Sequence, residues 1–238
     1  MVNFNVKDIA RKLRRVYKTL LGYDFFIKAD VEREYVALGS SYGEWNIIPE
    51  YISRDSVVYL FGVGEDISFD LQLIEKYGAT IHAFDPTPKS IKWVKSQNTP
   101  NEFIMHEYGI LDYDGFVSFY PPKNISHVSH TIIGGSTEEQ ECIKVPVKKM
   151  QTILDDLQHT TIDLLKMDIE GSEYSVIKDL SQGNIRPKQL LVEFHHRFKG
   201  VGANKTIEAI KTIKGMGYEL FFVSKSGEEY SFVLKDYI

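Results

Sequence analysis

The chain has 238 residues, of which 43% are apolar and 26% are charged, and its formal net charge at neutral pH is -5. These proportions are ordinary for one large globular domain, with or without a small appendage. The negative charge disfavours a general nucleic-acid binder, because phosphate contacts need a basic face. The single cysteine excludes an internal disulfide, and the apolar runs are too short for a signal peptide or a transmembrane segment. We therefore expect a cytoplasmic protein.

Residues 1–50 are expected to form a segment of their own, made of a helix and a loop. Between residues 3 and 21, apolar side chains recur every three or four positions from Val6 to Leu20, among six basic residues and one acid. This pattern predicts an amphipathic helix that docks on the body through its apolar stripe. A homodimer contact and a peripheral contact with an anionic membrane are the alternatives. The loop 38–49 holds two glycines and two large aromatic residues, which suits either a lid or a cluster packed on the main core.

The stretch 57–67 is the most informative part of the chain. Five apolar or aromatic residues run from Val57 to Phe61 without alternation, which predicts a strand covered on both faces. Gly62 and Gly64 then permit a tight turn with positive φ and a close approach of the backbone to a ligand. The sequence therefore predicts a strand, a glycine turn and the start of a helix.

A glycine turn between a strand and a helix is where parallel sheets bind nucleotides. Here Ile67 replaces the third small residue of the dinucleotide fingerprint, and Glu65 and Asp66 stand where the charge of a diphosphate would lie. Two carboxylates suit a cationic ligand instead, and S-adenosylmethionine carries both an ammonium group and a sulfonium. The alternative is an ordinary strand–helix turn without a ligand.

From residue 57 onward, expected strands and helices alternate, which predicts an α/β fold with a mostly parallel sheet and helices on both faces. Helices are expected at 66–77, 89–97, from residue 152, and at 204–214. Strands are expected at 57–61, 80–84, 102–107, 116–120, 143–147, 162–167, 189–196, 217–223 and 229–234. The last two should pair as a closing antiparallel hairpin.

Several local signals refine these elements. Asp66, Thr152 (with Asp155) and Asn204 are expected to cap their helices. The first helix should turn Ile67, Leu71 and Ile74 inward and end near Gly78. Pro146 should make 143–147 an edge strand, because proline cannot donate to a central ladder. The polar stretch 121–142 suits an insertion that contacts a substrate.

Asp85 follows the second strand of this series, 21 positions after Gly64. A carboxylate about 20 residues beyond the glycine turn commonly accepts hydrogen bonds from both hydroxyls of a ribose. The alternative is a helix cap or a solvated acid in the turn before Pro86.

Residues 108–115 follow the third strand and offer neighbours for an adenine ring. Ile110 and Leu111 could flank the ring, and Asp112 could accept a hydrogen bond from its exocyclic amine. A hairpin turn at Asp114–Gly115 is a compatible interpretation.

Lys166 lies inside the expected central strand 162–167, and Asp168 lies at its tip. The two side chains share a face, because strand residues alternate by two. A buried lysine is costly unless it is paired, and Asp168, Glu170 or Glu173 could supply the partner. The pair is either a structural ion pair or part of an active site, where perturbed charges gather.

The strand 189–196 ends in Glu193, His195 and His196. It should lie beside the strand that ends at Asp168, with Glu193 and His195 on one side and His196 on the other. Asp168, Glu193 and a histidine at neighbouring strand tips could transfer protons or hold a divalent cation. A solvated pair of histidines is the alternative.

Four stretches together resemble the FkbM family of S-adenosylmethionine-dependent methyltransferases: 60–69, 82–88, 165–173 and 191–195. The most specific are 165–173 (Leu-Lys-Met-Asp-Ile-Glu-Gly-Ser-Glu) and 82–88 (His-Ala-Phe-Asp-Pro-Thr-Pro). The resemblance covers about residues 38–238. It implies a Rossmann-like, seven-stranded class I methyltransferase sheet in a domain over 51–238, closed by a C-terminal antiparallel hairpin and preceded by the helical extension.

The resemblance also implies where S-adenosyl-L-methionine binds. The turn 62–66, with Phe61 beside it, would hold the methionine portion, Asp85 the ribose, and Ile110 and Leu111 the adenine, while Asp168 would lie next to the cofactor. The family implies O-methylation, often of a hydroxyl on a sugar or a secondary metabolite, so the expected partner is a small-molecule or glycan acceptor.

The expected catalytic residues lie at the strand tips. His195 and Glu193 are candidates for the base, and Asp168 for orienting the acceptor or a metal ion. Lys166 is a candidate for tuning Asp168 or for supporting the cofactor pocket. Two rival functions stay open: a nucleotide-dependent oxidoreductase, and a non-catalytic binding protein that kept the sheet.

Overall fold

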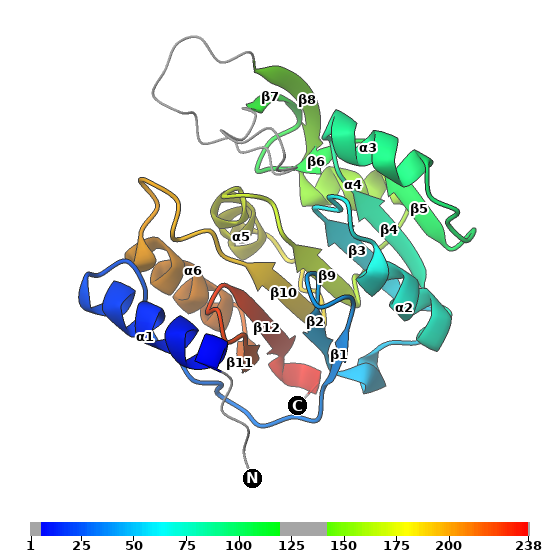
Figure 1. The fold of residues 1–238 in the computed structure, drawn as a ribbon. Coiled ribbons are helices and arrows are strands. Elements are labelled where there is room, and N and C mark those ends of the chain that lie inside the picture. The colour runs from blue at the N-terminus through cyan, green and yellow to red at the C-terminus, as the bar shows by residue number, and fades with distance from the viewer. Residues whose placement is uncertain (1–5, 120–141, 238) are drawn as a thin grey trace.

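The computed structural model describes residues 6–119 and 142–237, with side chains from Leu13 onward. A seven-stranded sheet forms its centre (Figure 1). The strands run in the order β11 (Tyr218–Val223), β12 (Glu229–Leu234), β10 (Gln189–Glu193), β9 (Leu164–Met167), β3 (Val57–Phe61), β4 (Thr80–Phe84) and β5 (Phe103–His106). β10, β9, β3, β4 and β5 are parallel, and β12 pairs antiparallel with both β10 and β11. The predicted mostly parallel sheet with an antiparallel closing hairpin is confirmed.

Helices and a small sheet cover the two faces of the main sheet. One hydrophobic cluster joins it to α4 (Met150–Leu157), α5 (Glu173–Gln182) and α6 (Ala203–Gly215). A second cluster joins the other face to α2 (Ser68–Tyr77), to α3 (Pro88–Lys95) and to the two-stranded sheet of β1 (Val36–Leu38) and β2 (Trp45–Ile47). Because strand side chains alternate between the faces, Leu190 and Val192 enter the first cluster and Leu191 the second. This explains why the central strands are apolar without alternation.

A three-stranded sheet lies beside the main sheet (Figure 1). In it, β8 (Ile143–Lys148) lies between β6 (Gly109–Ile110) and β7 (Gly115–Phe119). The prediction of an edge strand at Pro146 was therefore wrong. The proline is tolerated because β6 pairs only with Val147 and Lys148, which follow it. The hairpin expected at Asp114–Gly115 is also absent from this sheet, since β6 and β7 both pair with β8. The predicted substrate insertion, 121–142, lies outside the described residues except for the exposed Cys142.

The N-terminal helix α1 (Val6–Leu20) forms as predicted, but its orientation was not predicted correctly. The described members of the apolar stripe face solvent: Leu13 is 64% exposed and Leu20 is 81% exposed. Arg15 points inward instead, where its guanidinium donates to the carbonyl of Phe25 at 2.9 Å and lies 3.5 Å from the carboxylate of Asp24. The ion pair with a buried acid thus orients the helix, and the homodimer or membrane contact expected of it stays a prediction.

Three expected helix caps are not formed, because each side chain has another partner or position. α2 begins at Ser68, and Asp66 accepts the N–H of Ser68 from outside the helix while also bonding Ser40. Thr152 is the third residue of α4 and donates to Asp114. Asn204 lies inside α6, which follows Gly202. Two short 3-10 turns are also present, Pro49–Tyr51 and Lys235–Tyr237. Among the described residues, no helix is both long and apolar enough to cross a bilayer.

Candidate active site

A cavity of about 620 Å³ opens at the carboxyl ends of the parallel strands. Its walls come from the turns after β3, β4 and β9, the end of β10, the start of β12, and the loop before β2. This is the edge at which open α/β sheets bind ligands. The volume falls in the range of about 300–1,000 Å³ that is usual for small-molecule sites.

The charge of this cavity is strongly one-sided. Among the described residues, its lining has one basic residue, Lys166, and nine acids: Glu44, Glu65, Asp66, Asp70, Asp85, Asp168, Glu170, Glu193 and Glu229. Low-dielectric walls that carry one sign of charge concentrate ligands of the opposite sign. The cavity is therefore suited to a ligand with positive charge.

The two glycines of the turn after β3 have different roles. Gly62 and Gly64 both have positive φ, 84° and 59°. A Cβ at Gly62 would lie 1.7 Å from the carbonyl oxygen of Asp168, whereas a Cβ at Gly64 would meet nothing within 4 Å. Gly62 is thus required for packing β3 against the end of β9, and only Gly64 leaves its side open to the cavity.

Asp85 closes the same turn from the end of β4. Its Oδ2 accepts the backbone N–H groups of Val63 at 3.1 Å and Gly64 at 3.0 Å, and its Oδ1 accepts that of Thr87 at 2.8 Å. The carboxylate is buried and also lines the cavity. Since a carboxylate has about four lone-pair positions, three of them hold the turns together and about one is left for a ligand.

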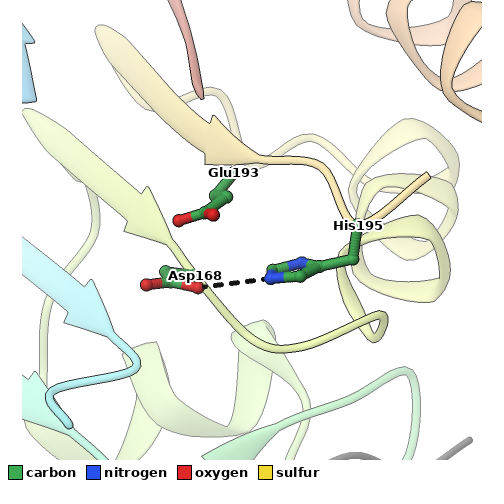
Figure 2. Close-up of side chains that lie close together, drawn as sticks. All are labelled: Asp168, Glu193 and His195. Atoms are coloured by element: carbon green, nitrogen blue, oxygen red, sulfur yellow. Dashed lines mark ion pairs between the residues drawn. The ribbon is translucent and has the colours of Figure 1, made fainter. Parts of the chain in front are cut away.

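Three of the predicted catalytic residues converge at the tips of β9 and β10. Asp168, Glu193 and His195 each present one potential ligand atom, and these atoms lie within 4.8 Å of one another. Figure 2 shows the imidazole directed at the carboxylate of Asp168, with that of Glu193 to one side. Its Nε2 lies 3.7 Å from Asp168 Oδ1 and 3.4 Å from Glu170 Oε2. The predicted neighbourhood of Asp168, Glu193 and a histidine is confirmed, but β10 ends at Glu193, so His195 lies after the strand and not within it.

His195 is held in this position by Glu173, which is fully buried at the start of α5. Oε1 of Glu173 accepts the backbone N–H of His195 at 2.9 Å and lies 3.4 Å from the ring Nδ1. Oε2 of Glu173 accepts the N–H of Gly171 at 2.8 Å. Phe198 packs against the imidazole with ring centroids 4.8 Å apart. The orientation of the imidazole is thus fixed by the surrounding fold.

Comparison with known proteins decides the family. The sequence matches the family model described as "Methyltransferase FkbM domain" over residues 57–220, which includes the glycine turn, Asp85 and the Asp168–Glu193–His195 cluster. The chain belongs to the FkbM methyltransferase family.

The chain is also similar to one curated protein and to one solved structure. "Probable methyltransferase-like protein 24" from Homo sapiens is 24% identical over 159 residues, which cover 66% of this chain and 37% of that protein. A crystal structure of methyltransferase FkbM from Methylobacillus flagellatus is 14% identical, with a TM-score of 0.48, and the alignment covers 76% of this chain and 44% of that one. The matched part spans less than half the length of either relative.

The pKa values of Glu193 and His195 are shifted by burial and by the neighbouring carboxylates. Burial and the neighbouring Asp168 raise the pKa of Glu193 to about 9, and Glu229 lies directly opposite Glu193 in the antiparallel pair of β10 and β12. Burial lowers the pKa of His195, but the carboxylates of Glu173, Glu170 and Asp168 outweigh it and raise the pKa to about 10. The solvated pair of histidines is excluded, because His195 and His196 are both buried.

Lys166 is buried, but its partner is not the expected one. Its ammonium group donates to the carbonyl of Gly62 at 3.0 Å and lies 5.1 Å above the ring of Trp45. Among the described residues, no ion pair joins Lys166 to Asp168. Lys166 therefore stabilises the glycine turn directly, through a charge-assisted hydrogen bond to its backbone.

The apolar end of the cavity is formed by the residues predicted for the adenine. Ile110 and Leu111 are buried in its wall. Phe61 also lines it and stacks on Phe84 at 4.3 Å between ring centroids. Asp112, in contrast, is exposed and does not belong to the cavity wall.

Several residues of the wall were not predicted from the sequence. Tyr42, from the loop before β2, and Trp45, the first residue of β2, form one side of the cavity. Asp70 is buried in the first turn of α2, and its Oδ1 has no hydrogen-bond partner within the described parts of the chain. Glu229 reaches the site because β12 is antiparallel to β10 and pairs it with Glu193. The closing hairpin was predicted, so the register of β12 was the signal that could have identified Glu229.

Proposed function

We propose that this FkbM-family protein is an S-adenosylmethionine-dependent O-methyltransferase that acts on a hydroxyl of a sugar or a secondary metabolite. The observation that carries the proposal is the acidic cavity at the carboxyl ends of the strands, whose described wall has nine carboxyl groups and one lysine. A ligand with an ammonium group and a sulfonium compensates this charge, whereas a diphosphate would add to it.

The residues of the cavity fit the parts of such a cofactor. The open side of Gly64 and the unpartnered Oδ1 of Asp70 would receive the methionine end. Asp85 would accept from the ribose with its remaining lone pair, and Ile110 and Leu111 would border the adenine. On this basis the domain over 51–238 is a Rossmann-like class I methyltransferase, for which the observed strand order provides support.

When bound, the cofactor would supply a methyl group on a positively charged sulfur for an acceptor oxygen. The task of the chain is then to orient the acceptor, exclude water and receive the hydroxyl proton. Orientation can contribute about 7–11 kcal/mol, and a positioned base contributes about 10²–10⁴-fold. We assign receipt of the proton to Asp168 and orientation of the acceptor to Glu193 and His195. The three meet at one point of the wall, and the raised pKa values of Glu193 and His195 keep these two groups protonated near neutral pH. Lys166 affects these residues indirectly, because it binds the glycine turn that packs against the backbone of Asp168.

Binding distinguishes this function from its rivals. We expect calorimetry on the full chain to show binding of S-adenosylmethionine and S-adenosylhomocysteine at one site, and no binding of NAD. A ligand that binds only the folded state also raises the melting temperature. Binding of NAD would favour an oxidoreductase, and binding of neither class would favour a non-catalytic protein.

The O-methyl assignment needs a second experiment. Incubation with methyl-labelled cofactor and a panel of glycans, small alcohols and amines should place label on oxygen. Replacement of His195 by glutamine should lower turnover of the labelled acceptor and leave cofactor affinity nearly unchanged. Label found on nitrogen alone would contradict the assignment.

A further inference from the structure

We propose that Asp168, Glu193 and His195 form a binding site for one divalent cation, and that the cation holds the acceptor hydroxyl in the cavity. The acceptor role rests on the proposed function, whereas cation binding does not. The three potential ligand atoms lie within 4.8 Å of one another. Two ligand atoms that share an ion at about 2.1 Å lie at most about 4.2 Å apart, so modest side-chain movements would complete the site.

The buried imidazole of His195 distinguishes this site from an ordinary group of surface acids. His195 is 93% buried, yet Nδ1 makes no hydrogen bond to any described residue, and Nε2 approaches the carboxylates of Glu170 and Asp168 only at 3.4 and 3.7 Å. An imidazole nitrogen that is buried and aimed among carboxylates has the geometry of a ligand that lacks its ion. Figure 2 shows this orientation.

The surroundings of His195 match those of a metal-binding histidine. Such a histidine usually directs its second ring nitrogen to a carboxylate, which fixes the ring and the tautomer. Glu173 occupies that position, 3.4 Å from Nδ1, and is itself fixed by the backbone N–H groups of Gly171 and His195. The carboxylate is fully buried, and its two backbone hydrogen bonds hold it beside the imidazole.

The ligand set and the open side of the site indicate the kind of ion. Two carboxylates and one imidazole suit Mn²⁺, since carboxylates favour Mg²⁺ and Mn²⁺ and imidazole favours the later transition metals. Three protein ligands leave positions open for water or a hydroxyl. Asp168 and Glu193 line the cavity, so these positions face the space where the acceptor would bind, and an ion there would polarise the acceptor oxygen.

The test measures Mn²⁺ binding to the full chain by the loss of the electron paramagnetic resonance signal of free Mn²⁺. We expect one Mn²⁺ per wild-type chain and an affinity at least tenfold weaker in Glu193→Gln. Glu65→Gln is the matched control: it removes one carboxylate from the same cavity, but Glu65 is exposed and pairs with Lys89. Its affinity should stay within about threefold of the wild type. Glu173→Gln should weaken binding about 10–100-fold, provided that its circular dichroism shows it to be folded.

Two results would overturn the proposal. One is the absence of Mn²⁺ binding by folded wild-type protein at 1 mM Mn²⁺ (~10⁻³ M, the weak end of protein cation sites). The other is equal weakening in Glu193→Gln and Glu65→Gln, which would show a general effect of charge. Titration of the same samples with S-adenosylhomocysteine separates the two proposals. Cofactor binding without Mn²⁺ binding refutes the cation site alone, and Mn²⁺ binding without cofactor binding refutes the methyltransferase function.

Discussion

Oδ2 of Asp85 accepts a hydrogen bond from the backbone N–H of Gly64 at 3.0 Å. The carboxylate at the end of β4 thus stabilises the glycine turn after β3. We predict that this residue also contributes to cofactor binding, because it lines the cavity and has a lone pair that the fold does not use. The same side chain would then link the shape of the turn to recognition of the ribose.

Replacement of Asp85 by alanine should weaken binding of S-adenosylhomocysteine. Hydrogen bonds to a charged group contribute about 1.5–3 kcal/mol, which is about ten- to a hundredfold in Kd. Calorimetric titration measures the change. Asp55→Ala is the control, because Asp55 is an exposed acid just before the amino end of β3, away from this cavity. An unchanged Kd in a folded Asp85→Ala protein would remove the ribose assignment.

The two glycines of the turn should respond differently to alanine. A Cβ at Gly62 would overlap the carbonyl oxygen of Asp168, and backbone cannot move aside as a flexible side chain can. Gly62→Ala should therefore prevent folding or destabilise the protein severely. Gly64→Ala meets no atom within 4 Å and should cost only about 1–2 kcal/mol, the penalty of a left-handed conformation. Urea denaturation compares them, and equal stabilities would contradict this division of roles.

The main sheet could be predicted because its strands carry their own signal. Val57–Phe61 and Gln189–Glu193 are buried on both faces, so unbroken apolar runs identify them whatever their neighbours are. Helix caps and edge strands have a weaker sequence signal, because a polar side chain can form hydrogen bonds with several alternative partners. Thr152 bonds Asp114, which is 38 positions away, and Asp66 bonds Ser40. Neither partner could be identified from local sequence.

The residues of the candidate site also fall into those that could be predicted from the sequence and those that could not. Asp85, Asp168 and Glu193 follow or end predicted parallel strands, so their meeting at one edge follows from topology. Asp70 was missed because its helix was expected to turn only Ile67, Leu71 and Ile74 inward. These three do pack in or against the second cluster, but within α2 the fully buried residues are Phe69, Asp70 and Leu73. A rotation of the helix about its axis decides whether this acid faces the cavity, and spacing alone does not determine that rotation.

The buried carboxyl of Asp70 should make stability depend on pH. Burial raises its pKa to about 6, above the value of an unfolded chain, about 3.9. The folded state therefore binds the proton more tightly. The destabilising effect of the buried Asp70 carboxylate is fully present above pH 6 and disappears as the pH falls from 6 towards 4.

Asp70→Asn should accordingly be more stable than the wild type at pH 7.5 by up to about 3 kcal/mol, since one pKa unit corresponds to about 1.4 kcal/mol. The difference should shrink towards pH 4. Guanidinium denaturation at several pH values measures it. Asp156→Asn, an acid that is 47% exposed, should show no comparable trend. A difference independent of pH would show that Asp70 is not the titrating group.

Asp24 should be essential for the N-terminal segment, although it lies outside the predicted motifs. Its carboxylate is fully buried and lies 2.5 Å from Arg197 Nη2, 3.5 Å from Arg15 Nε and 3.6 Å from His196 Nε2. It therefore connects α1 to the segment that follows β10, directly after His195. Removal of one partner from a buried ionic group costs about 3–5 kcal/mol, because the remaining charges lose their compensation.

Asp24→Ala should therefore destabilise the protein by about 3–5 kcal/mol. It should also increase hydrogen exchange in α1 over residues 13–20, because Arg15 holds the helix by its inward side while Leu13 and Leu20 face solvent. Glu107→Ala is the control: it breaks the exposed pair with Lys95 and should change stability by less than about 1 kcal/mol. If α1 exchanged equally slowly in Asp24→Ala and in the wild type, the helix would be held by contacts other than this ion pair.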